Sequence, residues 1–410
     1  MRVPMLHLIP AHQNRPSDDP IFALNKEATE RKARGESIIN ATVGALLDDD
    51  GKLAVLPASA KAVREVPDSE WAPYAPIEGS HDFLKAVVAD LFEKNPKLRD
   101  VAVAGATPGG SGALRHAIAN YIEPGQSLLT SSFYWGPYQT LADEADRKVA
   151  TFSMFAVDER GTPKGLDVAA LDRSLGELVA AQGRALVFLN DPCHNPTGYS
   201  MSPGEWAEVA SCLQKHGKSA PVTVLLDVAY SAYAATDPRT HFGRVEELLA
   251  SDVGVLFAWS ASKTFTHYGL RVGAVVACVP DATERKMTEA AFSYSSRGTW
   301  SNCNRGAMRA VTRLLTDPEL ASACRTEREG LKKLLAARVA AFNALAPKAG
   351  LRYPRYEGGF FVTVFEQDPQ AKAKALREKG IYVVPQRGAV RVALCGVPER
   401  DIARLVEAMA

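Results

Sequence analysis

Four nearly continuous apolar runs in the middle of the chain restrict its fold more than any other feature. They are Arg184–Leu189 (RALVFL), Val222–Leu226 (VTVLL), Val253–Phe257 and Val272–Val279. A strand with one exposed face alternates polar and apolar residues, whereas a strand buried on both faces is apolar throughout. The runs therefore predict a mainly parallel sheet with helices on both of its faces.

Helical spacing and chain length complete the expected architecture. Apolar residues recur at helical intervals over 203–215 and 318–345, and short strand-like runs return over 360–365 and 381–394. A chain of 410 residues is longer than one hydrophobic core usually serves, so two domains are expected. We expect an α/β fold in which a large domain occupies the middle of the chain and both chain ends form a smaller α+β domain.

Charge and cysteine usage argue against several classes of function. The 48 basic and 47 acidic residues leave a net charge of +1, so nothing attracts the whole chain to nucleic acid or to an anionic membrane. The six cysteines form no C-x-x-C pair, which argues against zinc and thioredoxin-like motifs and predicts no metal. Residues 1–20 show no signal-peptide pattern, and no apolar run approaches the roughly 20 residues of a membrane helix, so a cytoplasmic location is expected.

Asp227 directly follows one of the apolar runs, at the carboxyl end of a predicted buried strand. Ligands of open α/β sheets bind just beyond that end. A buried carboxylate is costly unless it has a positive partner. Asp227 is therefore either a capped or salt-bridged residue, or the partner of a positively charged ligand group such as a protonated pyridine nitrogen.

Lys263 follows another apolar run within the segment Ser260–Lys263 (SASK). Most lysines are solvated surface groups, but this one has the hydroxyls of Ser260 and Ser262 just before it and Arg271 eight residues later. Hydroxyl groups and arginine suit a phosphate. A desolvated lysine near other cations has a lowered pKa and can act as a Schiff-base nucleophile.

Two loops rich in glycine and proline follow further strand-like runs. Pro108–Leu114 (PGGSGAL) is either a structural turn or a turn whose backbone N–H groups bind a phosphate at the start of a helix. Asp191–Gly198 (DPCHNPTG) is either a rigid turn or a loop that lets Asn195 donate a hydrogen bond to an oxygen on a ligand ring.

Five motifs occur in one order and together resemble a known family. They are Pro108–Arg115, His194–Gly198 (HNPTG), Asp227–Tyr230 (DVAY), Ser260–Lys263 and Arg271–Gly273 (RVG). The set is similar to the class I aminotransferases of fold type I, specifically the aspartate and aromatic branch, whose cofactor is pyridoxal 5′-phosphate (PLP). The match covers most of the chain.

This resemblance implies an arrangement of domains and subunits. The large PLP-binding domain would span residues 53–317 and contain a mainly parallel sheet of seven strands sandwiched by helices. The small domain would combine residues 17–52 with 318–410, and residues 1–16 would form an N-terminal arm. A homodimer with shared active sites would be expected.

The resemblance also implies a role for each matching residue. Lys263 would hold PLP as a Schiff base and then move the substrate proton. Asp227 would keep the pyridine nitrogen protonated, and Tyr230 would hydrogen-bond the ring oxygen. These three are the expected catalytic residues. The remaining expected cofactor contacts are Gly110, Ser111, Gly112, Ser260, Ser262 and Arg271 at the phosphate, Trp135 and Asn195 at the ring, and Tyr74 reaching the phosphate from the neighbouring subunit.

Substrate contacts are implied in the same way. Arg391 would bind the substrate α-carboxylate, and Gly44 would lie where a side chain would intrude on the substrate. Trp135 and Asn195 would also face the substrate. Arg297 would bind the distal carboxylate of a dicarboxylic substrate from the neighbouring subunit, and a surface or interface charge is the alternative. Departures from the family pattern near Arg297 leave the choice between acidic and aromatic substrates open.

Amino-group transfer from an acidic or aromatic L-amino acid to a 2-oxo acid such as 2-oxoglutarate, by a ping-pong mechanism, is the expected activity. A PLP-dependent lyase or decarboxylase on the same fold is the alternative, because the cofactor supplies the electron sink in each case. A regulator with an aminotransferase-like domain would need a DNA-binding segment, and the first 40 residues show no basic helix-turn-helix. A dinucleotide-binding oxidoreductase is disfavoured because the glycine-rich turn lacks the proper fingerprint.

Overall fold

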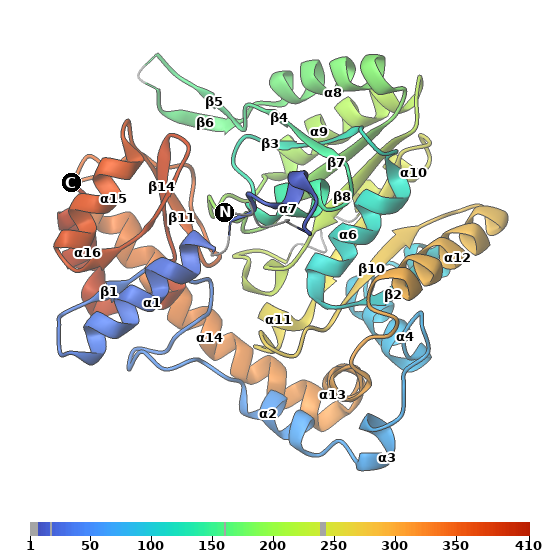
Figure 1. Ribbon diagram of the computed structural model, residues 1–410, viewed down its shortest axis with the longest axis horizontal. Coiled ribbons are helices and arrows are strands. Elements are labelled where there is room, and N and C mark those ends of the chain that lie inside the picture. The colour runs from blue at the N-terminus through green and yellow to red at the C-terminus, as the bar shows by residue number, and fades with distance from the viewer. Residues whose placement is uncertain (1–6, 17–18, 160, 238–242) are drawn as a thin grey trace, which may run out of the picture.

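A seven-stranded sheet forms the centre of the protein in the computed structural model, which describes residues 7–16, 19–159, 161–237 and 243–410 (Figure 1). In spatial order its strands are β2 (Ala102–Thr107), β10 (Gly273–Cys278), β9 (Gly254–Ser260), β8 (Val222–Asp227), β7 (Ala185–Asn190), β3 (Ser127–Ser131) and β4 (Lys148–Phe152). Strand β10 is antiparallel to both of its neighbours, and the other neighbouring strands pair in parallel. This confirms the expected α/β fold with a mainly parallel sheet.

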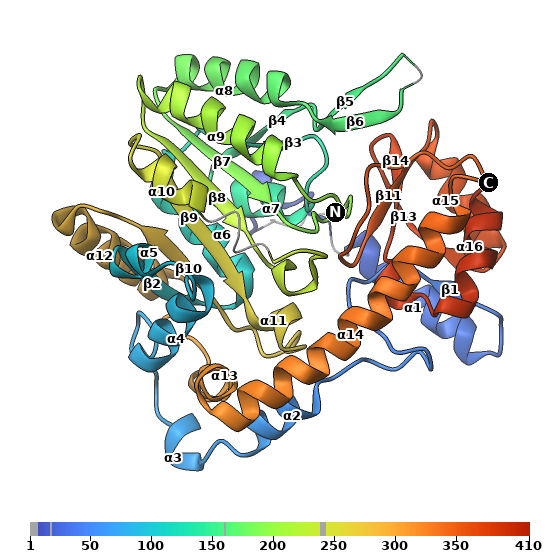
Figure 2. The same ribbon diagram turned by 180° about the vertical axis from the view of Figure 1, so that it is seen from behind.

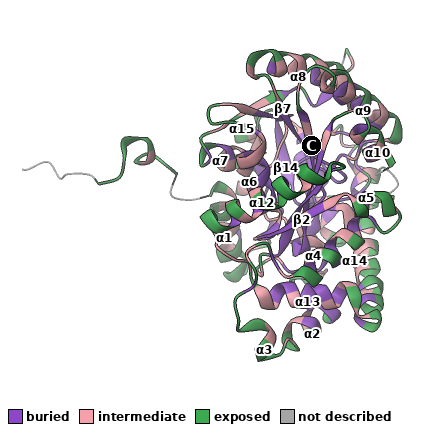
Figure 3. Cartoon of the chain, turned by 90° about the vertical axis from the view of Figure 1, so that its right-hand side faces the viewer, coloured by how far each residue is buried: buried purple, intermediate pink, exposed green. Residues whose placement is uncertain are grey.

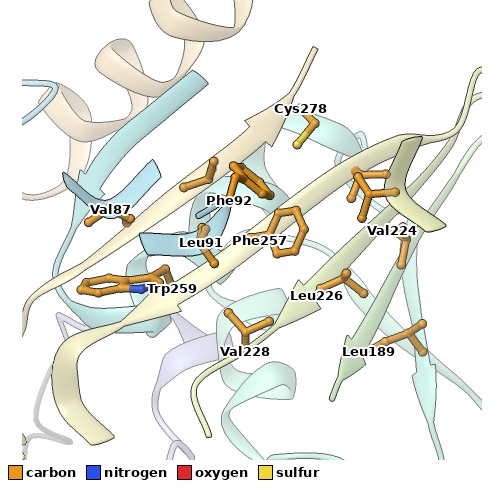
Figure 4. Close-up of a cluster of buried hydrophobic side chains, with 14 of the residues drawn as sticks. Val87, Leu91, Phe92, Leu189, Val224, Leu226, Val228, Phe257, Trp259 and Cys278 are labelled. Atoms are coloured by element: carbon orange, nitrogen blue, oxygen red, sulfur yellow. The ribbon is translucent and has the colours of Figure 1, made fainter. Parts of the chain in front are cut away.

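Each central strand contributes side chains to two hydrophobic cores, one on each face of the sheet. In β8, Val224 and Leu226 point into one core and Leu225 into the other. In β9, Phe257 and Trp259 belong to the first core (Figure 4). Successive strand residues point to opposite faces, so a strand covered on both sides must be apolar throughout. The continuous apolar runs in the sequence arise from this double burial.

Helices cover both faces of the sheet. One face carries α6 (Gly109–Tyr121), α7 (Pro137–Asp143) and α12 (Ala282–Thr299). The opposite face, nearer the viewer in Figure 2, carries α4 (His81–Leu91), α8 (Val168–Gln182), α9 (Pro203–Gly217), α10 (Gly243–Leu249) and α13 (Arg305–Thr316). Shorter elements complete this part of the chain: α2 (Pro57–Arg64), α3 (Asp68–Trp71), α5 (Pro96–Asp100), β5 (Phe155–Val157), β6 (Pro163–Leu166), η2 (Ser231–Tyr233) and α11 (Ala261–Thr264).

Both ends of the chain meet around a second, smaller core beside the large sheet (Figure 1). The N-terminal end provides α1 (Pro20–Ala33) and β1 (Ile39–Asn40), and β1 pairs in parallel with β12 (Ile381–Tyr382). The C-terminal end adds a three-stranded sheet and helices: β11 (Val362–Phe365), β14 (Ala389–Val392), β13 (Val384–Gln386), α15 (Pro369–Glu378), η4 (Leu394–Gly396), η5 (Glu399–Asp401) and α16 (Ile402–Met409). The long helix α14 (Pro318–Leu345) connects the two cores, since Leu320 packs in the larger and Phe342 in the smaller.

The described N-terminal residues 7–16, which include η1 (Pro10–His12), are almost all exposed and extend away from the body (Figure 3). Arg15 forms an ion pair with Glu144, next to the end of α7. The first six residues of the predicted arm, and residues 17 and 18 of the predicted small domain, lie outside the described residues. Within the described part of the chain, every helix is too short or too polar to cross a membrane.

Candidate active site

Three neighbouring strands end in polar residues at the same edge of the large sheet. Strand β7 ends at Asn190, β8 at Asp227 and β9 at Ser260. Asn190 and Asp227 are register partners, and the Asn190 side-chain amide donates to the Asp227 carbonyl oxygen over 2.8 Å. The carboxyl edge of an open α/β sheet is where ligands bind. It is therefore the candidate site.

Asp227 is buried at this edge, with 7% of its surface exposed. Its carboxylate accepts hydrogen bonds from the Tyr138 hydroxyl over 2.8 Å and from the Ala229 backbone N–H over 3.3 Å. Burial raises the pKa of Asp227 to about 6, even though both hydrogen bonds lower it. A ligand that brings a positive charge to this carboxylate would offset the cost of its burial.

Lys263 belongs to the short helix α11, which directly follows β9. Its amine donates a hydrogen bond of 2.6 Å to the Gly44 carbonyl oxygen. It also lies over aromatic rings, 4.4 Å from the ring centre of Tyr268, 5.6 Å from that of Phe360 and 5.7 Å from that of Tyr230. The amine is therefore held at a fixed point among apolar surfaces.

The surroundings of Lys263 favour its neutral form. Burial lowers the pKa of Lys263 to about 8, and the positive charges of Arg271 and Arg391 act in the same direction. A neutral amine is a nucleophile and a base, whereas an ammonium group is neither. Lys263 therefore lies within electrostatic reach of Arg271, eight residues later, and of Arg391, which is distant in the sequence.

The glycine-rich turn lies against Arg271. Helix α6 begins at Gly109, so the N–H groups of its first turn have no partner within the helix. Arg271 donates hydrogen bonds to the Ser262 hydroxyl over 3.2 Å and to the Pro108 carbonyl oxygen over 3.4 Å. A Cβ atom on Gly109 would lie 2.4 Å from the Arg271 guanidinium, and one on Gly112 would lie 2.6 Å from the Pro108 ring. Only glycine allows this close approach.

Gly110, Ser111 and Ser260 border the same corner. Gly110 and Ser111 lie in the first turn of α6, and a Cβ atom on Gly110 would lie 3.5 Å from the Ser260 Cβ. The Ser260 hydroxyl accepts a hydrogen bond from the Ser262 N–H over 3.2 Å, which caps α11. Hydroxyls, helix N–H groups and a guanidinium therefore converge here, and this donor set suits a phosphate.

Tyr230 packs in the smaller core, and its hydroxyl meets Asn195. The Asn195 backbone N–H donates to the Asn190 side-chain oxygen over 2.6 Å. The Asn195 side chain hydrogen-bonds the Tyr230 hydroxyl, and burial raises the pKa of Tyr230 well above its ordinary value. The Asn195 side-chain oxygen is buried and has no hydrogen-bond partner among the described residues. Trp135 is partly buried and meets Tyr138 edge-on, with ring centres 5.9 Å apart.

Arg391 comes from β14 of the small three-stranded sheet and is 4% exposed. One terminal nitrogen donates to the Thr42 carbonyl oxygen, and the guanidinium lies 4.6 Å from the ring centre of Phe361. Its Nε atom is buried without a hydrogen-bond partner among the described residues. Burial lowers the pKa of Arg391. A carboxylate binding here would provide both a charge partner and an acceptor.

Residues 36–409 match the model of the family described as aminotransferase class I and II. The chain belongs to this family. A solved aminotransferase from Anaerococcus prevotii DSM 20548 has a TM-score of 0.91 at 32% identity, with 98% of each chain covered. The aromatic-amino-acid aminotransferase of Paracoccus denitrificans is 28% identical over 95% of this chain and 96% of its own. The mitochondrial aspartate aminotransferase of Schizosaccharomyces pombe is 27% identical over 74% of this chain and 67% of its own.

Tyr74 and Arg297 of this aminotransferase lie on neighbouring segments outside the Lys263 cluster. Tyr74 is 88% exposed, and the exposed Arg297 donates to the Ser301 hydroxyl over 2.7 Å. Asn302 donates to the Ala75 carbonyl oxygen over 3.0 Å, which holds the two segments together. The expectation that both residues act on a neighbouring subunit stays a prediction.

Two residues of the aminotransferase site were missed by sequence reasoning. Tyr138 holds the Asp227 carboxylate, and Asn190 fixes both Asp227 and Asn195 through its side chain. Asn190 carried a usable signal, because it is a polar residue at the carboxyl end of an apolar run. Glycine is required at position 44, because a Cβ atom there would lie 2.3 Å from the Phe361 ring.

Proposed function

We propose that this aminotransferase uses PLP to move the amino group of an acidic or aromatic L-amino acid to a 2-oxo acid such as 2-oxoglutarate. The observation that carries the proposal is the buried Lys263 amine, held among aromatic rings and within electrostatic reach of Arg271 and Arg391. Relatives named as aromatic-amino-acid and aspartate aminotransferases support the substrate range. Family membership favours amino transfer over the lyase or decarboxylase alternative.

The residues fit PLP at both ends of the cofactor. Asp227 would face the pyridine nitrogen, because its raised pKa of about 6 calls for a positive partner. The first turn of α6, Ser262 and Arg271 would bind the phosphate, because their donors converge and glycine leaves room for an anion. PLP, when bound, supplies an electron sink for the electrons left behind when the substrate α-proton departs.

Ring contacts would come from Asn195, Tyr230 and Trp135. The Asn195 amide and the Tyr230 hydroxyl hydrogen-bond each other, so they would present a pair of polar groups to an oxygen on the cofactor ring. Trp135 would cover one face of the ring. Asn190 and Tyr138 would position these groups through their bonds to Asn195 and Asp227.

Lys263 would carry the proton chemistry. With a pKa of about 8, roughly one tenth of the amine is neutral at pH 7 and half at pH 8, so its Nζ atom can take the α-proton of the amino acid. General acid–base transfer of this kind contributes roughly 10²–10⁴-fold to rate. The hydrogen bond to the Gly44 carbonyl oxygen fixes the direction from which the amine acts.

Arg391 would bind the substrate α-carboxylate. Its unpaired Nε atom and its buried charge suit a bidentate pair with a carboxylate. Gly44, close to both Lys263 and Phe361, would border the substrate. We also propose a cytoplasmic homodimer in which Tyr74 and Arg297 serve the partner's site, with Tyr74 at the phosphate and Arg297 at the distal carboxylate of an acidic substrate.

Borohydride reduction followed by peptide mapping tests the role of Lys263. The purified protein should absorb visible light, and the reduced cofactor should be found on Lys263. The Lys263→Ala variant should bind PLP without this covalent linkage and should lose transamination. Recovery of the reduced cofactor on another lysine would reject the proposal.

An amino-donor profile with 2-oxoglutarate as acceptor tests the role of Arg297. The Arg297→Leu variant should lose kcat/KM for aspartate by about tenfold or more, as loss of a charged hydrogen bond of about 1.5–3 kcal/mol implies, and should retain that for phenylalanine. Arg285→Leu, on the same helix, is the matched control and should change neither value. Equal aspartate turnover in the two variants would argue against the distal-carboxylate role.

A further inference from the structure

A cluster of three different side chains lies between α8 and α9, away from the candidate active site. Asp172 comes from α8, and Cys212 and His216 come from α9. Cys212 and His216 are four residues apart, so they point to the same side of their helix. Helices α8 and α9 lie together at the far end of the large sheet from α11 in both Figure 1 and Figure 2.

The spacing of the three side chains is close to that of a metal centre. The Asp172 Oδ1 atom lies 2.8 Å from His216 Nε2 and 3.7 Å from Cys212 Sγ. All three potential ligand atoms lie within 4.8 Å of one another. A tetrahedral zinc ion with bonds of about 2.0–2.3 Å keeps its ligand atoms about 3.3–3.6 Å apart. Small side-chain rotations would therefore bring the three atoms to coordinating positions.

Burial and access both suit an ion. Cys212 is buried and the His216 side chain is 12% exposed, whereas the Asp172 side chain is 35% exposed. An open groove lined by Asp172, Cys212 and Glu208 leads to the cluster. Glu208 stands one helical turn before Cys212, so a fourth ligand can come from this carboxylate or from water.

We propose that Asp172, Cys212 and His216 form a binding site for a divalent transition metal of the zinc type. A thiolate, an imidazole and a carboxylate together are typical ligands of zinc and cobalt. Magnesium and calcium take oxygen ligands, so this set disfavours them. A C-x-x-C pattern does not describe this set, because Asp172 and Cys212 lie 40 residues apart in the chain, on two different helices.

Lys215 sets the orientation of the carboxylate. Its amine donates to Asp172 Oδ2 over 2.7 Å and to Oδ1 over 2.9 Å. In the metal-bound form Lys215 keeps Oδ2, while Oδ1 binds the ion. A group that hydrogen-bonds a metal ligand in this way fixes the orientation of that ligand.

Metal binding must release a proton from Cys212. The metal–sulfur bond forms as the S–H bond breaks, and the proton passes to solvent. The His216 Nε2 atom, which contacts Asp172 Oδ1 in the metal-free protein, would exchange that contact for the ion.

Calorimetric titration of the purified protein with zinc chloride tests the site. We expect one tight zinc ion per chain and, from titrations in buffers of different ionisation enthalpy, proton release on binding. Asp172→Asn, Cys212→Ser and His216→Gln should each weaken binding at least tenfold, and Cys212→Ser should release about one proton fewer than the parent. Each variant should keep the parent's transaminase activity, which shows that it is folded.

Matched controls separate this site from zinc held elsewhere. Cys303→Ser and the exposed His81→Gln remove a thiol and an imidazole outside the cluster and should leave zinc affinity unchanged. The proposal is overturned if the parent binds zinc no more tightly than the triple variant of the cluster. It is equally overturned if Cys303→Ser and Cys212→Ser weaken binding to the same extent.

Discussion

Asp227 should destabilise the protein in the absence of PLP, and Asp227→Asn should relieve this. The carboxyl is buried, and burial raises its pKa from 3.8 to about 6. A difference of about 2 pKa units corresponds to about 3 kcal/mol, because each unit is about 1.4 kcal/mol. Asparagine has nearly the same shape and carries no charge, so it avoids most of this cost. Its amide oxygen accepts a weaker hydrogen bond from the Tyr138 hydroxyl than the carboxylate does, so the free energy of unfolding should rise by about 2–3 kcal/mol.

The expected gain depends on pH, and its sign follows from the raised pKa. The folded state holds the Asp227 proton more tightly than the unfolded state does, so protonation favours folding. The destabilisation is therefore nearly absent at about pH 4, grows as the pH rises from about 4 to about 6, and is complete above that. Asp227→Asn should be the more stable protein at pH 8 and about equal to the parent near pH 4.

Urea unfolding of the cofactor-free proteins at pH 8, 6 and 4 measures this difference. Asp50→Asn, at an exposed position, is the control and should match the parent at every pH. PLP should reverse the order at pH 8, because only the parent offers a carboxylate to the protonated ring nitrogen. The reasoning fails if cofactor-free Asp227→Asn is less stable than the parent at pH 8, or if the difference does not change with pH.

Two further variants test close packing and a buried charge. Gly109→Ala should weaken PLP binding, measured by fluorescence, about tenfold or more, equivalent to about 1.4 kcal/mol, because the new Cβ would displace Arg271. Gly125→Ala is the control, because Gly125 has a similar positive φ but open space around it, and its affinity for PLP should be unchanged. Arg338→Met should lower the free energy of unfolding by about 2–6 kcal/mol, because it leaves the carbonyl oxygens of Cys395 and Leu47 without this buried donor, at about 1–3 kcal/mol each. Asp49→Asn keeps a side-chain oxygen that can accept from Arg338, so it should cost less than Arg338→Met; equal losses in these two variants would contradict the assignment.

The large sheet could be predicted where double burial leaves a strong signal. Strand β8 and helix α14 lie where their apolar patterns indicated, and α14 spans Pro318–Leu345. Strands β3 and β4 were not predicted. They are only five residues long, and β4, at the edge of the sheet, is mostly not buried and begins with an exposed lysine. An edge strand need not be apolar on both faces, so its sequence resembles that of a loop.

The site could be predicted only where local position carried the information. Asp227 and Lys263 stand at the ends of recognisable strands, and the edge of a sheet is where ligands bind. Tyr138 gave no comparable signal, because its bond to Asp227 joins residues 89 positions apart and depends on how α7 crosses the sheet. Arg391 was identified through the family resemblance, since its contact with Thr42 requires both chain ends to come together.

Burial disfavours the charged forms of Asp227, Lys263 and Arg391 alike. It raises the pKa of the acid and lowers the pKa of both bases, and it is the largest cause in each case. In the proposed reaction Asp227 faces the ring nitrogen, Lys263 takes the substrate proton, and Arg391 binds the substrate carboxylate. The free energy lost by burying these groups is recovered when cofactor and substrate bind, so it strengthens binding. Substitutions that neutralise them should therefore stabilise the cofactor-free protein while they weaken the enzyme, a trade-off expected wherever function requires strained electrostatics.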